Sequence, residues 1–131
     1  MMTEQRIKTS SRECLIDITE QVKTIIAKSG IDDGIAVVYC PHTTAGITIN
    51  EGADPSVRSD IVRFLGDMIP RTYSFDHAEG NSDAHIKASI IGSSVNLLVQ
   101  DGGIVLGTWQ SIYFCEFDGP RSRKYLVKVT G

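Results

Sequence analysis

The chain has 131 residues, of which 41% are hydrophobic and 22% are charged, and its formal net charge is -3. A chain of this length buries about two-thirds of its unfolded surface as one domain, without help from disulfides or a structural metal. We therefore predict a single domain over residues 1–131. No run of Lys or Arg forms a stripe for a phosphate backbone, so we expect no nucleic-acid partner.

The first residues contain no apolar signal region, and the longest apolar run, residues 35–40, is far too short to cross a bilayer. We therefore expect no membrane partner and a cytoplasmic location. Cys14, Cys40 and Cys115 are odd in number and widely spaced, which indicates neither a disulfide framework nor a cysteine zinc cluster. Reduced thiols fit the cytoplasm.

The first half of the chain has patterns of both strands and helices. Residues 5–17 are typical of two strands joined by a turn, and a helix is expected to start at a cap on Thr19 and to end near Gly30. The β-branched run 35–40 predicts a buried strand that ends at Pro41. Strict alternation over residues 47–51 predicts a strand with one wet face.

The second half begins with a helix that Asp54 is expected to cap, with Pro55 at its first position. Ser82 or Asp83 is expected to cap a short third helix. Strands are then predicted over residues 96–100, 104–106, 108–117 and 125–130, with Asp-Gly at 101–102 as a hairpin signal. The strand at 108–117 is partly apolar on both faces. The sequence thus predicts the α+β class, a mainly antiparallel β-sandwich with helices packed on the outside.

Residues 74–87, with the sequence Ser-Phe-Asp-His-Ala-Glu-Gly-Asn-Ser-Asp-Ala-His-Ile-Lys, hold two of the three histidines, His77 and His85. The third, His42, lies in Cys-Pro-His-Thr-Thr-Ala-Gly. Three protein nitrogens and an open position form a catalytic zinc arrangement, so these imidazoles are candidate ligands of one divalent metal. The alternative is a solvated loop, because this spacing is not a short zinc signature.

Two further patterns allow a chemical interpretation. Cys40 stands two residues before His42, so on an extended segment their side chains share a face and could form a nucleophile–base pair. The basic cluster at residues 119–124 carries Arg121 and Arg123, which could grip a phosphate or pyrophosphate. The alternative, which the sequence alone favours because surface charge is common, is a solvated turn balanced by Glu116 and Asp118.

Several motifs together resemble the YjbQ-like family: residues 42–46 (His-Thr-Thr-Ala-Gly), 50–51 (Asn-Glu), 77–85 (His-x-Glu-Gly-Asn-x-x-Ala-His), 107–110 (Gly-Thr-Trp-Gln) and 118–121 (Asp-Gly-Pro-Arg). The resemblance covers essentially the whole chain. It implies a compact β-sandwich decorated with helices, a homotrimer, and three histidines near one metal site. The family is often labelled a secondary thiamine-phosphate synthase, which would imply joining a pyrimidine diphosphate to a thiazole phosphate with release of pyrophosphate.

These considerations assign roles to individual residues. The predicted metal ligands are His42, His77 and His85, with zinc as the expected metal. The predicted catalytic carboxylates, which would also orient the imidazoles, are Glu51, Glu79 and Asp83. The predicted substrate-binding residues are Thr43, Asn81, Gln110, Arg121 and Arg123.

The sequence therefore predicts a small-molecule enzyme with a three-histidine metal site and a phosphorylated substrate, with weak thiamine-phosphate synthase activity as the family resemblance implies. One alternative is a metal-dependent hydrolase in which Glu79 is the general base on a metal-bound water. Another is a non-catalytic trimeric protein that binds a small ligand or a metal.

Overall fold

The structure is a computed structural model and describes residues 2–131. Strands and helices follow one another along the chain in a mixed order. They are β1 (Met2–Lys8), β2 (Cys14–Asp17), α1 (Thr19–Lys28), β3 (Gly34–Tyr39), β4 (Ala45–Glu51), α2 (Pro55–Met68), α3 (Ser82–Ile91), β5 (Ser94–Gln100), β6 (Gly103–Ile104), β7 (Gln110–Glu116) and β8 (Ser122–Thr130).

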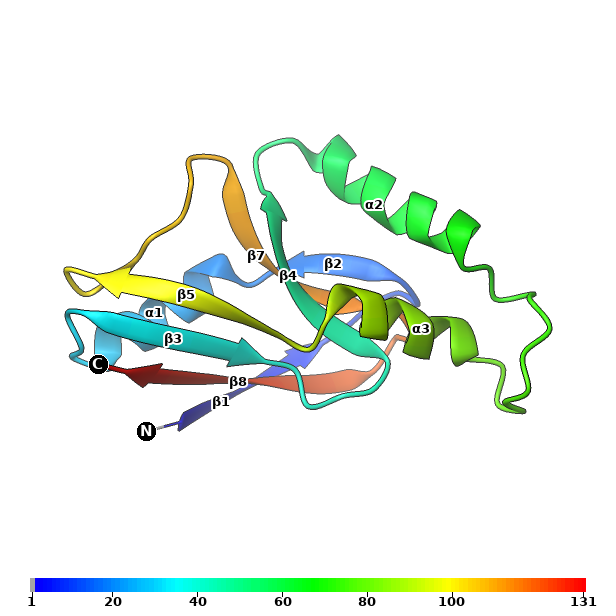
Figure 1. Cartoon of the computed structure of the whole chain (residues 1–131), viewed down its shortest axis with the longest axis horizontal. Coiled ribbons are helices and arrows are strands. Elements are labelled where there is room, and N and C mark those ends of the chain that lie inside the picture. Colours follow the sequence, from blue (N-terminus) through cyan, green and yellow to red (C-terminus); the bar gives the residue numbers. More distant parts are fainter. Residues whose placement is uncertain (1) are drawn as a thin grey trace.

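The strands form two antiparallel sheets (Figure 1). The larger sheet has the order β1-β8-β3-β5-β6, and the smaller has the order β2-β7-β4. The last strand, β8, lies between the first strand and β3, since Met2 pairs with Lys128 and Ile35 with Thr130. The predicted α+β class with a dominant antiparallel architecture is confirmed.

The main core lies between the two sheets and α1. Val22 and Ile26 of α1 are fully buried against Val38 of β3, Ile47 of β4 and Phe114 of β7, among others. Burying a side chain of this size stabilises the fold by about 1.5–3 kcal/mol. This core fixes the ends of β3 and β4, between which His42 lies.

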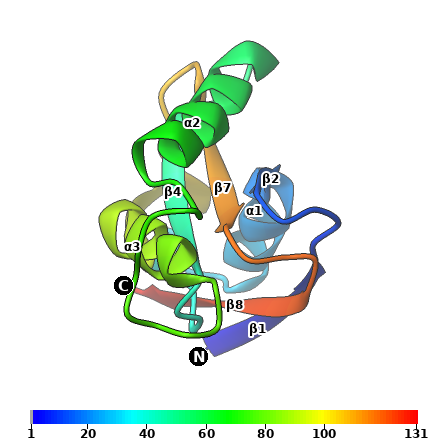
Figure 2. The same ribbon diagram turned by 90° about the vertical axis from the view of Figure 1, so that its right-hand side faces the viewer.

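A second core covers the other face of the small sheet, where α2 and α3 pack (Figure 2). Leu65 of α2 and Ala84 of α3 lie in this cluster with Tyr113 and Cys115 of β7. Strand β7 is therefore buried on both faces, which explains why the sequence of residues 108–117 is apolar on both. Packing of α3 on this face fixes the position of His85.

The helix starts differ in part from the sequence prediction. Asp54 caps α2 as predicted, since its side chain accepts a hydrogen bond from the Ser56 N–H at 2.9 Å. The predicted cap at Thr19 is wrong, because the Asp17 carboxylate accepts the Thr19 N–H at 2.9 Å and the cap position belongs to Ile18. Residue Asn81 holds the corresponding position of α3 and makes no capping hydrogen bond with its side chain.

No helix within residues 2–131 combines the length and the apolarity that a membrane crossing requires.

Candidate functional site

A surface hollow of about 400 Å³ lies between the β3–β4 loop and α3. The loop contributes His42 and Thr43, and α3 contributes His85 and Ser89. The remaining lining residues are small and come from β4, from α3 and from the turn between α3 and β5: Ala45, Ala88, Gly92 and Ser93. The hollow therefore brings together two of the three histidines and several hydroxyl groups.

The ring of His42 is held in one tautomer by the backbone of β8. Its Nε2 atom accepts a hydrogen bond from the Lys124 N–H at 3.0 Å. A nitrogen that accepts a hydrogen bond carries no proton, so in the neutral ring the proton lies on Nδ1. Neutral His42 is therefore a hydrogen-bond donor through Nδ1–H.

The surroundings of His42 favour this neutral form. Burial and the positive charge of Arg123, with a smaller effect from Lys124, lower the pKa of His42 below its usual value of 6.5. Both effects act against the imidazolium, because burial removes water and like charges repel. His42 is consequently uncharged at neutral pH, which leaves the basic side chains as the source of positive charge near the hollow.

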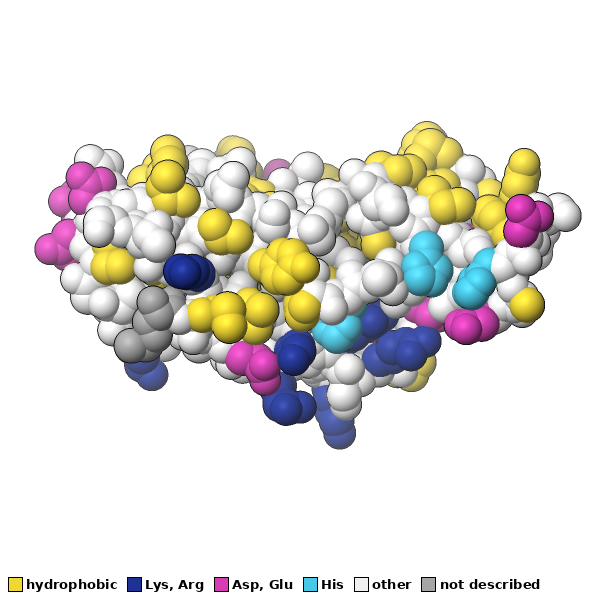
Figure 3. Space-filling view, turned by 60° about the horizontal axis from the view of Figure 1, so that its bottom comes forward, with side chains coloured by type: hydrophobic (Ala, Val, Ile, Leu, Met, Phe, Trp, Pro, Cys, Tyr) yellow, Lys and Arg dark blue, Asp and Glu magenta, His cyan; other side chains and the backbone are white. Residues whose placement is uncertain are grey.

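His85 lies on the first turn of α3 and lines two adjoining hollows. The second hollow is also lined by His77 and Asp76, and the ring centroids of His77 and His85 lie 5.7 Å apart. Figure 3 shows the three histidine side chains on one face of the molecule, two of them adjacent and the third close to Lys and Arg side chains. His77 does not line the hollow that His42 and His85 share.

The predicted three-histidine metal site does not form in the described part of the chain. Within residues 2–131, no group of three or more His, Cys, Asp or Glu side chains is arranged to hold a metal ion. A neutral imidazole ligates through its unprotonated nitrogen, and in His42 that atom already accepts the Lys124 N–H.

The function predicted from the sequence, an enzyme built on this site, is therefore wrong. The metal-dependent hydrolase and the metal-binding module that relied on the same three ligands are wrong as well. The expected choice of zinc remains a prediction.

Asp83 belongs to a buried ion network instead of the hollow. Its carboxylate accepts hydrogen bonds from Arg12 at 3.0 and 3.1 Å and from Lys87 at 2.9 Å, and Lys87 also contacts Glu13. Asp83 is fully buried and Lys87 is 1% exposed. Burial alone would raise the pKa of Asp83, but the hydrogen bonds from Arg12 and Lys87 outweigh it and lower the pKa. Asp83 thus ties α3 to the loop before β2.

Arg123 belongs to a second buried network that supports the loop of His42. Its Nε donates to Glu116 at 2.9 Å and its Nη2 donates to the Thr44 hydroxyl at 2.8 Å. The Thr9 hydroxyl donates to the same carboxylate at 2.7 Å. Burial would raise the pKa of Glu116, but Arg123 and Thr9 lower it. The guanidinium therefore fixes Thr44, two residues after His42.

The remaining predicted site residues are divided between two regions. Asn81 donates to Asp118 at 2.9 Å, and Arg121 donates to the same carboxylate at 2.8 Å. Glu51 and Gln110 pair across β4 and β7 at the far end of β4 from Ala45. That end of β4 lies six residues from Ala45, which corresponds to about 20 Å along the strand from the hollow.

Glu79 is exposed, and its carboxylate lies 3.7 Å from the Nε2 atom of His77. The catalytic and binding roles of Glu51, Glu79, Asp83, Asn81, Gln110 and Arg121 remain predictions.

Cys40 faces the core and does not pair with His42. It is 1% exposed, and burial raises its pKa to about 11. A thiol in this state is not a thiolate nucleophile at neutral pH. No hydrogen bond joins the two side chains within residues 2–131.

Sequence reasoning missed several residues that shape the site. Ser89 and Ser93 line the hollow, and Arg12 and Lys87 bind Asp83. The spacing of Asp83 and Lys87, four residues apart on one helix, is a signal that could have indicated their pairing. Arg12 lies 71 residues away from Asp83 in the sequence, and no local pattern indicates that contact.

Comparison with known proteins gives a consistent result. A family model described as UPF0047 protein YjbQ-like matches residues 3–131. A UPF0047 protein of Methanocaldococcus jannaschii is 56% identical over 131 residues, which cover 100% of this chain and 95% of that protein. The UPF0047 protein YugU of Bacillus subtilis is 49% identical, with 100% of both chains covered.

Solved structures share the fold. The crystal structure of an uncharacterised conserved protein of the YjbQ/UPF0047 family from Clostridium acetobutylicum has a TM-score of 0.96 and 55% identity, covering 98% of this chain and 99% of that one. A protein of unknown function from Sulfolobus solfataricus has a TM-score of 0.96 and 34% identity, covering 100% of this chain and 96% of that one. The names of these relatives state no thiamine-phosphate synthase activity, so that part of the sequence prediction is also corrected.

Proposed function

The chain belongs to the UPF0047 family of YjbQ-like proteins, and we propose that its hollow at His42 and His85 binds a small anionic molecule, such as a phosphorylated metabolite, and exchanges protons with it without a metal. The observation that carries this proposal is that one hollow is lined by both imidazoles. Thr43, Ser89 and Ser93 line it as well, although the Ser89 hydroxyl already donates to the His85 carbonyl oxygen at 2.8 Å. Imidazole N–H and hydroxyl groups suit the oxygen atoms of a phosphate.

The charges near His42 favour an anion. Arg123 and Lys124 follow each other on β8, and both act electrostatically on the His42 ring. Glu116 offsets the charge of Arg123 in part, whereas the Nζ atom of Lys124 lies 3.3 Å from Glu4 in an exposed pair. An exposed pair is weak, so Lys124 can exchange this partner for a ligand oxygen. The attraction is expected to weaken as salt concentration rises.

The two histidines support different chemical roles. His42 is neutral and fixed as an Nδ1–H donor, so it suits the stabilisation of negative charge on a ligand oxygen without giving up its proton. His85 lies on the rim of two open hollows. An imidazole can act as a general acid or base, and His85 is placed to do so toward a ligand in either hollow.

The proposal includes two expectations about the setting of the protein. The three cysteines are free thiols, which favours a cytoplasmic location. The outer face of the five-stranded sheet exposes Ile35, Tyr39 and Leu98, and Leu98 is 62% exposed. Exposed apolar side chains side by side favour self-association, and we propose the homotrimer that the family resemblance implies.

The test compares three histidine variants in chelator-treated buffer, with inorganic phosphate as the probe and backbone NMR signals as the readout. His42→Ala and His85→Ala each remove a hydrogen bond to a charged ligand, which is worth about 1.5–3 kcal/mol. We therefore expect phosphate affinity to fall about 10- to 100-fold in each. His77→Ala is the matched control, because His77 does not line the shared hollow, and it is expected to keep the wild-type affinity.

Two results would contradict the proposal. One is equal loss of phosphate affinity in all three variants, which would assign the binding to the whole histidine group. The other is binding that occurs only after a divalent metal is added.

A further inference from the structure

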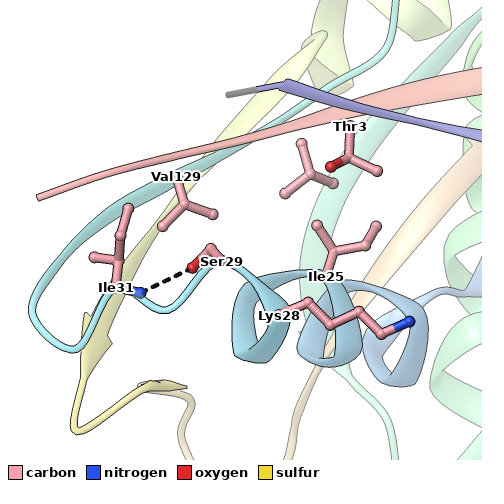
Figure 4. A pocket seen from close by; sticks show the side chains of 7 residues that line it. Thr3, Ile25, Lys28, Ser29, Ile31 and Val129 are labelled. Carbon is pink, nitrogen blue, oxygen red and sulfur yellow. Dashed lines mark hydrogen bonds between the residues drawn. The ribbon is translucent and has the colours of Figure 1, made fainter.

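A small cavity lies on another part of the molecule, between the end of α1 and the strands β1 and β8 (Figure 4). Its volume is about 160 Å³. It is lined by Thr3 of β1, by Ile25, Lys28, Ser29 and Ile31 of α1 and the following turn, and by Val127 and Val129 of β8. Residues of the hollow at His42 and His85 take no part in it.

The walls of the cavity are apolar. Ile25 belongs to α1 and Ile31 to the turn after it, and Val127 and Val129 belong to β8 of the large sheet. Apolar cavities of about 150 Å³ hold a molecule the size of benzene. At roughly 30 Å³ for each water-sized group, this cavity accommodates about five non-hydrogen groups. A short aliphatic chain therefore fits the walls in both size and polarity.

Three of the residues that line the cavity are polar, Thr3, Lys28 and Ser29, and Lys28 carries a positive charge. The ammonium of Lys28 and the hydroxyl of Thr3 make no hydrogen bond or ion pair within residues 2–131. Figure 4 shows the Lys28 side chain running past Ile25 along α1. Its flexible four-carbon stem lets the ammonium reach a group held in the cavity.

The polar groups of the lining also limit the charge of a ligand. The Ser29 hydroxyl is already engaged, since it donates to the Ile26 carbonyl at 2.6 Å and accepts the Ile31 N–H at 3.2 Å. The other carbonyls at the end of α1 carry partial negative charge, which opposes a doubly charged phosphate. One ammonium and one free hydroxyl instead match a carboxylate with a single negative charge.

We propose that this cavity is a binding site for a short-chain aliphatic carboxylate of about five carbons, with the chain between Ile25, Ile31 and the two valines and the carboxylate at Lys28 and Thr3. So small a ligand has few contacts, and its dissociation constant is expected to be about 1 mM. This site is independent of the hollow at His42 and His85.

The experiment follows NMR signals of the isoleucine and valine methyl groups while pentanoate is added at constant ionic strength. We expect saturable shifts confined to Ile25, Ile31, Val127 and Val129, with weaker binding of 1-pentanol and the weakest binding of pentylammonium. Lys28→Gln should weaken pentanoate binding about two- to fivefold and leave pentanol unchanged, as expected for an exposed ion pair. Lys23→Gln is the control, because Lys23 lies on α1 and does not line the cavity.

A second variant, Ile25→Phe, places extra volume in the cavity and should abolish binding of both pentanoate and pentanol while the protein stays folded by circular dichroism. Non-saturable shifts, shifts located at other residues, or equal pentanoate affinity in wild type and Lys28→Gln would overturn the proposal.

Discussion

At the scale of single residues, Asp83 shows how burial decides the role of a charged group. Its carboxylate is fully buried and receives hydrogen bonds from both Arg12 and Lys87. Removing one member of such a group leaves buried charges without a counter-charge, which is far more unfavourable than the loss of an exposed pair. Asp60, which pairs with Arg63 on the surface of α2 at 2.9 Å, provides that comparison.

We expect Asp83→Ala to reduce the free energy of unfolding by about 3–5 kcal/mol, because Arg12 and Lys87 lose their shared partner. Asp60→Ala should change it by less than about 1 kcal/mol. Urea unfolding monitored by circular dichroism measures both values. Equal effects of the two substitutions would show that the buried network contributes no more than a surface pair.

The roles of single residues were predictable only where the partner is close in sequence. The histidine stretch marked His85, and its helical position places it at the hollow. The tautomer of His42 depends on the Lys124 N–H, 82 residues away, and no local pattern indicates that contact. A basic residue near the end of a chain is expected at the surface. Arg123 is instead buried in an ion pair with Glu116.

At the scale of elements, β4 approaches the turn between α3 and β5 so closely that only glycine fits at position 46. A Cβ atom on Gly46 would lie 2.5 Å from the Gly92 carbonyl oxygen, and Gly92 itself lines the hollow. Gly66, inside α2, has ample space, since its nearest neighbour would be a Glu13 carboxylate oxygen at 3.7 Å. The close approach of two backbone segments therefore requires glycine at position 46, whereas the space around position 66 admits a side chain.

We expect Gly46→Ala to destabilise the protein by about 1–3 kcal/mol, since backbone cannot move aside as a side chain can. It should also weaken phosphate binding, because β4 must move away from Gly92 at the edge of the hollow. The matched substitution Gly66→Ala should stabilise the protein by about 0.5–1 kcal/mol, because alanine favours a helix. Thermal unfolding shows whether each variant is more or less stable than the wild type. A stabilised Gly46→Ala variant would contradict the close approach of β4 to the turn at Gly92.

Most helices and strands were predictable from the periodicity of apolar residues, because each element turns one face toward a hydrophobic core. Asp54 with Pro55 marked the start of α2 correctly. The starts of α1 and α3 were assigned to the wrong residues because Thr19 and Asp83 use their side chains in tertiary contacts. Local capping rules cannot take account of such contacts.

At the scale of the whole molecule, the buried ionisable groups predict how stability depends on pH. The pKa values of Asp83 and Glu116 are lowered from 3.8 and 4.5 by their cationic partners, which outweigh burial. The contribution of these two carboxylates to the free energy of unfolding is therefore complete above the ordinary pKa values of 3.8 and 4.5. It is lost as the pH falls through the lowered pKa values of the folded protein. Burial and Arg123 lower the pKa of His42 from 6.5, so its contribution is likewise lost on acidification, starting below that value.

We expect the free energy of unfolding to fall in two stages as the pH decreases, a shallow one below about 6.5 and a steeper one below about 4. Urea titrations at a series of pH values measure it. His42→Ala should remove the first stage and Glu116→Gln should reduce the second. A protein that becomes more stable on acidification would contradict these assignments.

The class of the fold could be predicted from the sequence, but the arrangement of its sheets could not. Alternation and turn signals indicate strands, yet they do not place β1 beside β8 or β3 between β8 and β5. That arrangement brings His42 next to Lys124 and separates it from His77. The predicted metal site failed for this reason, since it assumed that three histidines in one chain converge.

The central claim is that His42 and His85 together form a metal-independent anion site. The most direct measurement is the long-range ¹H–¹⁵N correlation of the histidine rings in chelator-treated protein, recorded while inorganic phosphate is added. We expect His42 to show the Nδ1–H tautomer, and the ring signals of His42 and His85 to shift saturably while those of His77 remain nearly constant. A protonated Nε2 on His42, or ring signals that respond to phosphate only in the presence of a divalent metal, would contradict the claim.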